Sequence, residues 1–149
     1  MTPAETVASF VEALDAGDLD RAAAYLSDDF VLDGLTPRPL DKPQFLAFVD
    51  SVRRAFPDWS FHPTGLQEQG STVMLTLRGT GTHTGDLRSP VPGLPEVPAS
   101  GRTVSLPDQP ARVTVRGDQV ASITVQPVAG GGILGILQQL GIQLPTRTV

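Results

Sequence analysis

One of the two histidines stands where a side chain could carry out acid–base chemistry. His83 lies between Gly81 and Gly85, just after a segment with strand-like alternation. An imidazole titrates near neutral pH, and glycines allow the backbone to approach a bound molecule closely. His83 is therefore a candidate general base or hydrogen-bond donor. The competing interpretation is that His83 forms local hydrogen bonds and shapes the end of the strand.

Two aspartates could take part in the same chemistry. Asp33 lies within the apolar segment 30–35, and Asp86 follows Gly85. A carboxylate that points into an apolar interior has a raised pKa and can accept a proton near neutral pH. If Asp33 points outward instead, it is a solvated carboxylate at a strand end. Asp86 is open to the same interpretation because it borders a loop.

Aromatic side chains near position 60 are candidates for the wall of a ligand pocket. Trp59 is the single tryptophan of the chain, and Phe61 follows it two positions later. Core packing explains both residues equally well, and the two roles coincide where a core also lines a cavity. The full set of residues expected to line the pocket is Leu32, Trp59, Phe61, Met74, Thr124 and Gln126.

Three helices are predicted in the first part of the chain. Thr2 and Glu5 can form a capping box at the start of the first helix. Asp18 can cap a short second helix, and Asp41 can cap a third helix that Pro57 ends. The predicted helices cover residues 3–16, 19–26 and 42–56.

The spacing of apolar residues then changes to that of β-strands. Residues 72–77 alternate, with Val73 and Leu75 on one face and Met74 on the other. Four prolines between positions 89 and 100 prevent ladder pairing, so that segment is predicted to be a loop. Further strands are predicted at 30–35, 59–64, 102–106, 111–116 and 120–128, with a hairpin turn at 117–118.

A short apolar helix is predicted after three consecutive glycines, 130–132. It could cap the mouth of the fold, cover the sheet of a second copy, or pack on its own core. Helices that precede the strands are typical of the α+β class. The expected architecture is a cone-shaped curved antiparallel sheet packed on three N-terminal helices, with this short C-terminal helix.

Composition limits the classes of partner. The 149 residues are 40% hydrophobic and 18% charged, which predicts one globular domain over residues 1–149. The net charge of -5 and the scattered basic residues argue against nucleic acid. No apolar run is long enough to cross a membrane, and no signal peptide is evident, so a cytoplasmic location is expected.

The sequence also lacks the usual markers of a metal or cofactor. There is no cysteine, and neither His62 nor His83 has a partner at metal-ligand spacing. No glycine-rich phosphate loop is present. We therefore expect no metal and no organic cofactor.

Short segments spread over nearly the whole chain resemble the SnoaL-like polyketide cyclase family of the nuclear transport factor 2-like superfamily. Each segment is weakly specific alone, and their order and spacing carry the resemblance. The segments are residues 16–18, 56–59, 81–85, 100–104, 117–120 and 137–141. The resemblance implies a cystatin-like roll with a hydrophobic pocket, a homodimer, and no required cofactor.

The chain departs from this family where the cyclases carry their reactive residues. Members resemble one another in having an acidic base on the last strand and a histidine on the strand before it. Residues 120–128 contain no acid and residues 111–116 contain no histidine. Two functions therefore stay open: cofactor-free lyase, isomerase or cyclase chemistry on an apolar carbonyl compound, or a non-catalytic dimeric binding module.

Overall fold

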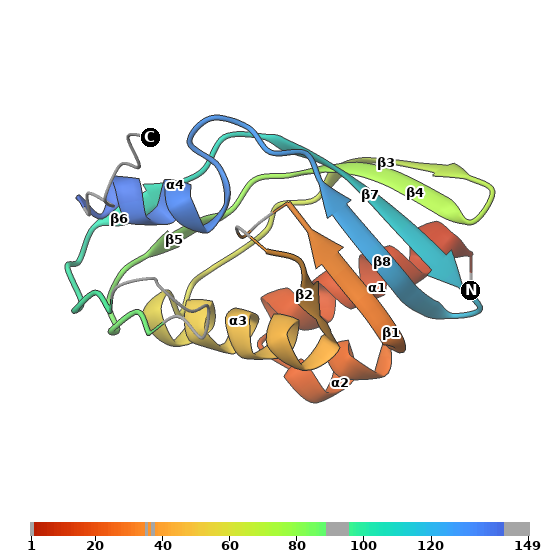
Figure 1. The fold of residues 1–149 in the computed structure, drawn as a ribbon, viewed down its shortest axis with the longest axis horizontal. Coiled ribbons are helices and arrows are strands. Elements are labelled where there is room, and N and C mark those ends of the chain that lie inside the picture. The colour runs from red at the N-terminus through yellow and green to blue at the C-terminus, as the bar shows by residue number, and fades with distance from the viewer. Residues whose placement is uncertain (1, 35, 37, 89–95, 142–149) are drawn as a thin grey trace.

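The computed structural model describes residues 2–34, 36, 38–88 and 96–141, and its fold is α+β as predicted (Figure 1). The helices are α1 (Pro3–Asp15), α2 (Leu19–Ala24), α3 (Lys42–Ala55) and α4 (Gly132–Gln139). The strands are β1 (Leu26–Asp33), β2 (Leu40–Asp41), β3 (Thr64–Gln69), β4 (Thr72–Leu77), β5 (Thr80–Thr82), β6 (Thr103–Ser105), β7 (Gln109–Arg116) and β8 (Gln119–Val125).

The N-terminal helices start at the residues that the capping patterns predict. Thr2 and Glu5 form a reciprocal capping box on α1. Asp41 forms the same motif with Gln44 at the start of α3, and the side chain of Asp18 caps α2. These caps satisfy backbone N–H groups that have no partner within the helix, and so fix where each helix begins.

The main sheet has six strands in the order β2-β1-β8-β7-β4-β3. Its neighbouring strands are antiparallel except for β1 and β8, which are parallel, with Leu32 beside Ile123. The expected antiparallel sheet is thus antiparallel in four of its five strand pairs and mixed as a whole. A parallel pair needs a long connection, and most of the chain separates these two strands. Strands β5 and β6 form a separate antiparallel pair.

Several strand boundaries differ from the prediction. Residues 27–29, which lie between the predicted helix at 19–26 and the predicted strand at 30–35, belong to β1. The expected strand at 59–64 is reduced to one bridge between Ser60 and Thr80, and β3 begins only at Thr64. His62 has a positive φ of 45° and precedes Pro63, which cannot donate to a ladder. Leu35, predicted to end the first strand, lies outside the described residues.

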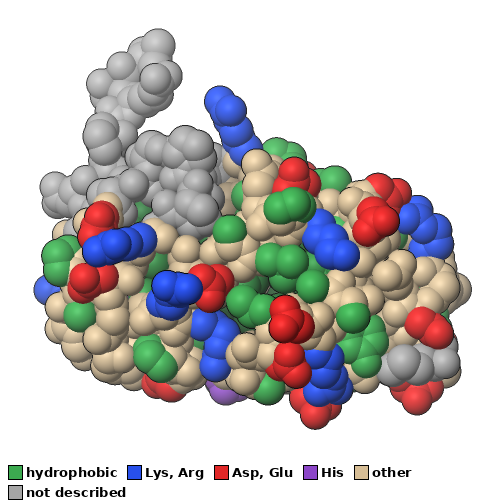
Figure 2. All heavy atoms as spheres, turned by 90° about the horizontal axis from the view of Figure 1, so that it is seen from below, with side chains coloured by type: hydrophobic (Ala, Val, Ile, Leu, Met, Phe, Trp, Pro, Cys, Tyr) green, Lys and Arg blue, Asp and Glu red, His purple; other side chains and the backbone are tan. Residues whose placement is uncertain are grey.

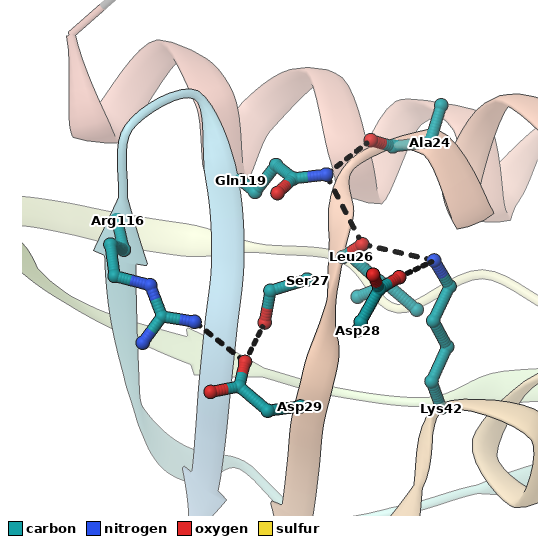
Figure 3. A network of polar contacts seen from close by, with 8 residues as sticks. All are labelled: Ala24, Leu26, Ser27, Asp28, Asp29, Lys42, Arg116 and Gln119. Atoms are coloured by element: carbon teal, nitrogen blue, oxygen red, sulfur yellow. Dashed lines mark hydrogen bonds and ion pairs between the residues drawn. The ribbon is translucent and has the colours of Figure 1, made fainter.

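Polar contacts fix the start of β1 against its neighbours (Figure 3). Gln119 Nε2 donates to the carbonyl oxygens of Ala24 and Leu26, each at 3.3 Å. Lys42 Nζ donates to the same Leu26 carbonyl at 3.1 Å. Arg116 pairs with Asp29 at 2.6 Å between Nη2 and Oδ1. These contacts join α2, α3 and the β7–β8 hairpin at the point where the register of β1 and β8 shifts.

The hydrophobic core lies between the helices and one face of the main sheet. Phe45 of α3 contacts Phe10 of α1 and Phe30 of β1, with ring centroids 6.2 Å and 5.2 Å apart. Charged side chains of both signs mix over the face seen in Figure 2. Within the described residues, no helix is long and apolar enough to cross a membrane.

Candidate functional site

An apolar cavity lies between α3 and α4, and we call it the α3–α4 cavity. Its volume is about 40 Å³. In Figure 1, α4 lies beside β6, away from α1 and α2, and α3 runs along the opposite side. Its lining includes Val52, Trp59, Phe61, Gln109 and Ile136.

A second apolar cavity, the α1 cavity, adjoins the first. Its volume is about 30 Å³, and α1 contributes four of its lining side chains. Phe61, Leu77 and Val125 line both cavities, so these three side chains form the partition between them. A ligand pocket usually has about 300–1,000 Å³, so the two cavities hold a small molecule only if the partition moves.

Neither cavity is lined by an acidic, basic or histidine side chain among the described residues. Apart from the indole N–H of Trp59, the polar side chain in the lining is the amide of Gln109. Removal of a proton next to a carbonyl needs a base within hydrogen-bond reach. The arrangement therefore favours binding of an apolar molecule over proton transfer inside these cavities.

Trp59 is held tightly against two glycines. A Cβ on Gly79 would lie within 2.9 Å of Cη2 of the indole, and a Cβ on Gly81 within 2.9 Å of its Cε3 atom. Phe56 and Phe61 contact the indole ring, with centroids 5.4 Å and 6.1 Å away. The Nε1 atom of Trp59 is buried and has no hydrogen-bond partner among the described residues.

Helix α4 closes the α3–α4 cavity and is fastened at both ends by side-chain amides. Gln109 Oε1 accepts from the backbone N–H of Gly132 at 3.2 Å, and Gln109 Nε2 donates to the Gln126 carbonyl at 3.3 Å. At the other end, Gln139 exchanges two hydrogen bonds with the backbone of Ser105, of 2.8 Å and 2.7 Å. The helix thus packs on its own chain, and its apolar side chains complete the cavity wall.

His83 lines neither of the two cavities. Its ring is fully buried and stacks on Phe56 with centroids 5.1 Å apart. Its Nδ1 atom accepts from the backbone N–H of Ser100 at 3.2 Å and lies 2.8 Å from the Ser100 hydroxyl. Its Nε2 atom is buried without a partner among the described residues. These contacts are those expected of a histidine that shapes local structure.

Burial lowers the pKa of His83, and a backbone contact with Val97 and the charge of Asp86 oppose this only partly. The unfolded chain therefore binds a proton near pH 6.5 that the folded chain does not yet bind. We predict that the free energy of unfolding decreases as the pH falls below about 6.5. Denaturant titrations at pH 7.5 and 5.5 measure this loss.

The matched variant for this prediction is His83→Gln, which removes the titrating ring and retains a hydrogen-bond acceptor. Its free energy of unfolding should change less between the two pH values than that of the unmodified protein. Equal pH dependence in both proteins would show that another group titrates.

The two candidate aspartates are exposed and stand apart from His83. Asp33 is the last residue of β1, and its side chain is exposed. It lines an open groove together with Thr36 and Gln109. Asp86 Oδ1 accepts from the backbone N–H of Ala99 at 3.0 Å and so joins the two ends of the loop. None of the described cavities contains two of these three candidates. Residues 89–95 of the predicted loop lie outside the described residues.

Three of the six expected pocket residues line a cavity, and three do not. Leu32 and Phe61 line the α1 cavity, and Trp59 lines the α3–α4 cavity. Met74, Thr124 and Gln126 are exposed and line neither cavity. Strand alternation explains why Met74 and Thr124 are exposed, because the neighbours of each residue on its strand point into the core.

Sequence reasoning missed Gln109 as a cavity residue. Gln109 is buried and faces both the α3–α4 cavity and the open groove that holds Asp33. Nothing in the local sequence distinguishes this glutamine from a solvent-exposed one. Among the described residues, no three histidine, aspartate or glutamate side chains gather in a way that could hold a metal ion.

Comparison of sequences assigns most of the chain to one family profile. The profile described as a SnoaL-like domain matches residues 7–123. No curated protein matches this chain at a significant level.

Comparison with solved structures identifies the same fold. A proposed polyketide cyclase from Pseudomonas putida KT2440 is 23% identical over 93% of this chain and 98% of its own, with a TM-score of 0.72. IdmH, a proposed polyketide cyclase from Streptomyces antibioticus, is 22% identical over 95% and 100%, with a TM-score of 0.70. A nuclear transport factor 2-like protein of unknown function from Cytophaga hutchinsonii is 13% identical over 84% and 88%, with a TM-score of 0.58.

At these identities the likeness establishes the fold alone. The chain has the nuclear transport factor 2-like α+β fold, which confirms the predicted fold class.

Proposed function

The chain belongs to the SnoaL-like domain family, and we propose that it binds an apolar small molecule without transforming it. The observation that carries this proposal is the lining of the two adjoining cavities, which is apolar and contains no titratable side chain among the described residues. A buried apolar cavity without charged groups favours molecules with few polar atoms.

We further propose that the ligand makes room by displacing Phe61. Phe61 is one of the three side chains that separate the two cavities, and it is only partly buried. It lies in an irregular segment next to His62, whose φ of 45° is unusual for a residue other than glycine. Rotation of Phe61 would join the cavities into one elongated apolar pocket.

Catalysis by His83, Asp33 or Asp86 has less support. None of the three lines either apolar cavity, and the cyclase residues on the last two strands are absent from this sequence. The homodimer, the single domain and the cytoplasmic location stay predictions, and so does the absence of a cofactor.

A matched pair of variants on α4 tests the binding proposal. Ile136 lines the α3–α4 cavity, whereas Leu134 lies on the outer face of the same helix and is 42% exposed. Ile136→Phe adds volume inside the cavity, and Leu134→Phe adds it on the outer face of α4, at the open groove that Asp33 also lines. The probe is the neutral apolar dye N-phenyl-1-naphthylamine, whose emission increases in apolar surroundings.

We expect saturable dye binding to the unmodified protein and to Leu134→Phe, and at least tenfold weaker binding to Ile136→Phe. Thermal unfolding of both variants shows whether the fold persists. Equal dye affinity in the two variants would place the dye elsewhere and would refute the proposal.

A further inference from the structure

The open groove that Asp33 lines borders the α3–α4 cavity, and we call it the Asp33 groove. Its volume is about 500 Å³, which is within the usual range of ligand pockets. Gln109 and Gly132 line both the groove and the α3–α4 cavity, so these two residues separate one space from the other. A ligand that passes the side chain of Gln109 would therefore occupy both spaces at once.

The side chain of Gln109 is the movable part of this partition. Its Oε1 atom accepts from the N–H of Gly132 at 3.2 Å, and its Nε2 atom donates to the Gln126 carbonyl at 3.3 Å. Both bonds are longer than the common value of about 2.9 Å, and long hydrogen bonds are weak. An apolar group that enters the cavity buries apolar surface, which offsets the loss of these two bonds.

Asp33 gives the groove a negative charge. Its side chain is exposed, and no hydrogen bond or ion pair joins it to another described residue. Among the described residues, no lysine or arginine side chain lines the groove. Arg112 lies in register two strands away, across Thr124 of β8. Two strand spacings are about 10 Å, roughly one Debye length at physiological salt, so Arg112 neutralises this carboxylate only weakly.

Thr36 adds a hydrogen-bond acceptor to the groove. Its hydroxyl donates to the carbonyl oxygen of Arg38, which leaves the lone pairs of Oγ1 for a ligand. An ionised carboxylate such as that of Asp33 is also an acceptor only. The N-terminus of α4 at Gly132 has the opposite preference, because helix N-termini favour anions, but the Gly132 N–H is already bonded to Gln109. The two acceptors match a positively charged head group with N–H donors.

We propose that the ligand is an amphipathic amine whose ammonium head lies in the Asp33 groove and whose apolar part passes Gln109 into the α3–α4 cavity. This proposal rests on the proposed binding function and adds the chemical class of the ligand: a largely apolar compound with one cationic head. An anionic head on the same apolar group is repelled by Asp33 and loses both acceptor contacts, so it binds more weakly.

Three compounds that share one phenylbutyl group serve as probes at pH 7.5. 4-Phenylbutylamine is a cation, 4-phenylbutanol is neutral and 4-phenylbutyrate is an anion. Isothermal titration calorimetry measures their affinities for the full chain. We expect the amine to bind about threefold more tightly than the alcohol and about tenfold more tightly than the carboxylate, as an exposed charge pair allows. Added salt should reduce both ratios, because it screens the charge of Asp33.

Three variants assign the head and the apolar part to their places. Asp33→Asn removes the charge and keeps the shape, so the ratio of amine to carboxylate affinity should fall below about threefold. The matched control Asp20→Asn changes the net charge equally at an exposed position on α2, outside the groove, and should keep that ratio. Ile136→Phe fills the α3–α4 cavity and should weaken all three compounds alike without changing their order.

Intermolecular nuclear Overhauser effects locate the two ends of bound 4-phenylbutylamine. Its aromatic protons should contact the methyl groups of Ile136 inside the cavity. The methylene protons next to its nitrogen should contact the methyl group of Thr36 in the groove. Aromatic contacts with Thr36 and none with Ile136 would overturn the proposed orientation.

The possible outcomes separate this proposal from the binding function beneath it. If the carboxylate binds as tightly as the amine, or if both aspartate variants change the ratio equally, the role of Asp33 is refuted. If Ile136→Phe leaves the three affinities unchanged, the compounds lie in the groove alone and the two-part site is refuted. If none of the three binds while N-phenyl-1-naphthylamine does, the amine class is refuted and the binding function stands. If the dye also fails to bind, both proposals fail.

Discussion

Replacing Phe56 with alanine is expected to lower the free energy of unfolding by about 4 kcal/mol. Phe56 is fully buried directly after α3 and contacts both Trp59 and His83. Truncation to alanine removes the ring and leaves an empty space between the cavity wall and the segment that begins at residue 84. A typical domain is stable by only about 5–15 kcal/mol, so this single change removes a large part of the total.

Chemical denaturation monitored by circular dichroism measures the effect of Phe56→Ala. The matched variant is Phe56→Leu, which keeps most of the buried apolar volume and should lose clearly less stability. A loss below about 1 kcal/mol in Phe56→Ala would contradict the proposed packing around Trp59 and His83.

Replacing Gly135 with alanine is expected to detach α4 from the cavity and to cost about 3 kcal/mol. Gly135 is buried on the inner side of α4. A Cβ at this position would clash with the carbonyl oxygen of Gly130, and it would lie 3.3 Å from Cδ2 of Leu106. The backbone oxygen cannot rotate away as a side chain could, so the helix itself must move.

Hydrogen exchange of the α4 amides and denaturant titration together test Gly135→Ala. Faster exchange should be confined at first to α4, because Ile133, Ile136 and Leu137 lose their buried positions. The control is Leu134→Ala on the exposed face, which should change stability by less than about 0.5 kcal/mol. Unchanged exchange and stability in Gly135→Ala would show that α4 does not depend on this close contact.

The sequence was most informative where local chemistry decides the structure. The capping residues Thr2 and Asp41 give the starts of α1 and α3, and alternation gives β4 to the residue. The parallel pairing of β1 with β8 was not predictable in the same way. It depends on which distant segments meet across the core, and no local pattern records that choice.

The candidate site was predictable only in part, for a related reason. Large apolar residues such as Trp59 and Phe61 line a cavity because the same force that buries them builds the core. Whether His83 faces the cavity depends on the path of the chain after β5, and glycines on both sides of it fit either outcome. Gln109 is placed by long-range contacts with α4, which its neighbours in the sequence do not reveal.

The proposed binding function requires a ligand site inside the fold, between α3 and α4. Intermolecular nuclear Overhauser effects between bound N-phenyl-1-naphthylamine and assigned methyl groups test this location most directly. We expect contacts with the methyl groups of Val52, Val125 and Ile136, which line the α3–α4 cavity. Contacts confined to the exposed methyl groups of Val31 and Leu134 would contradict it.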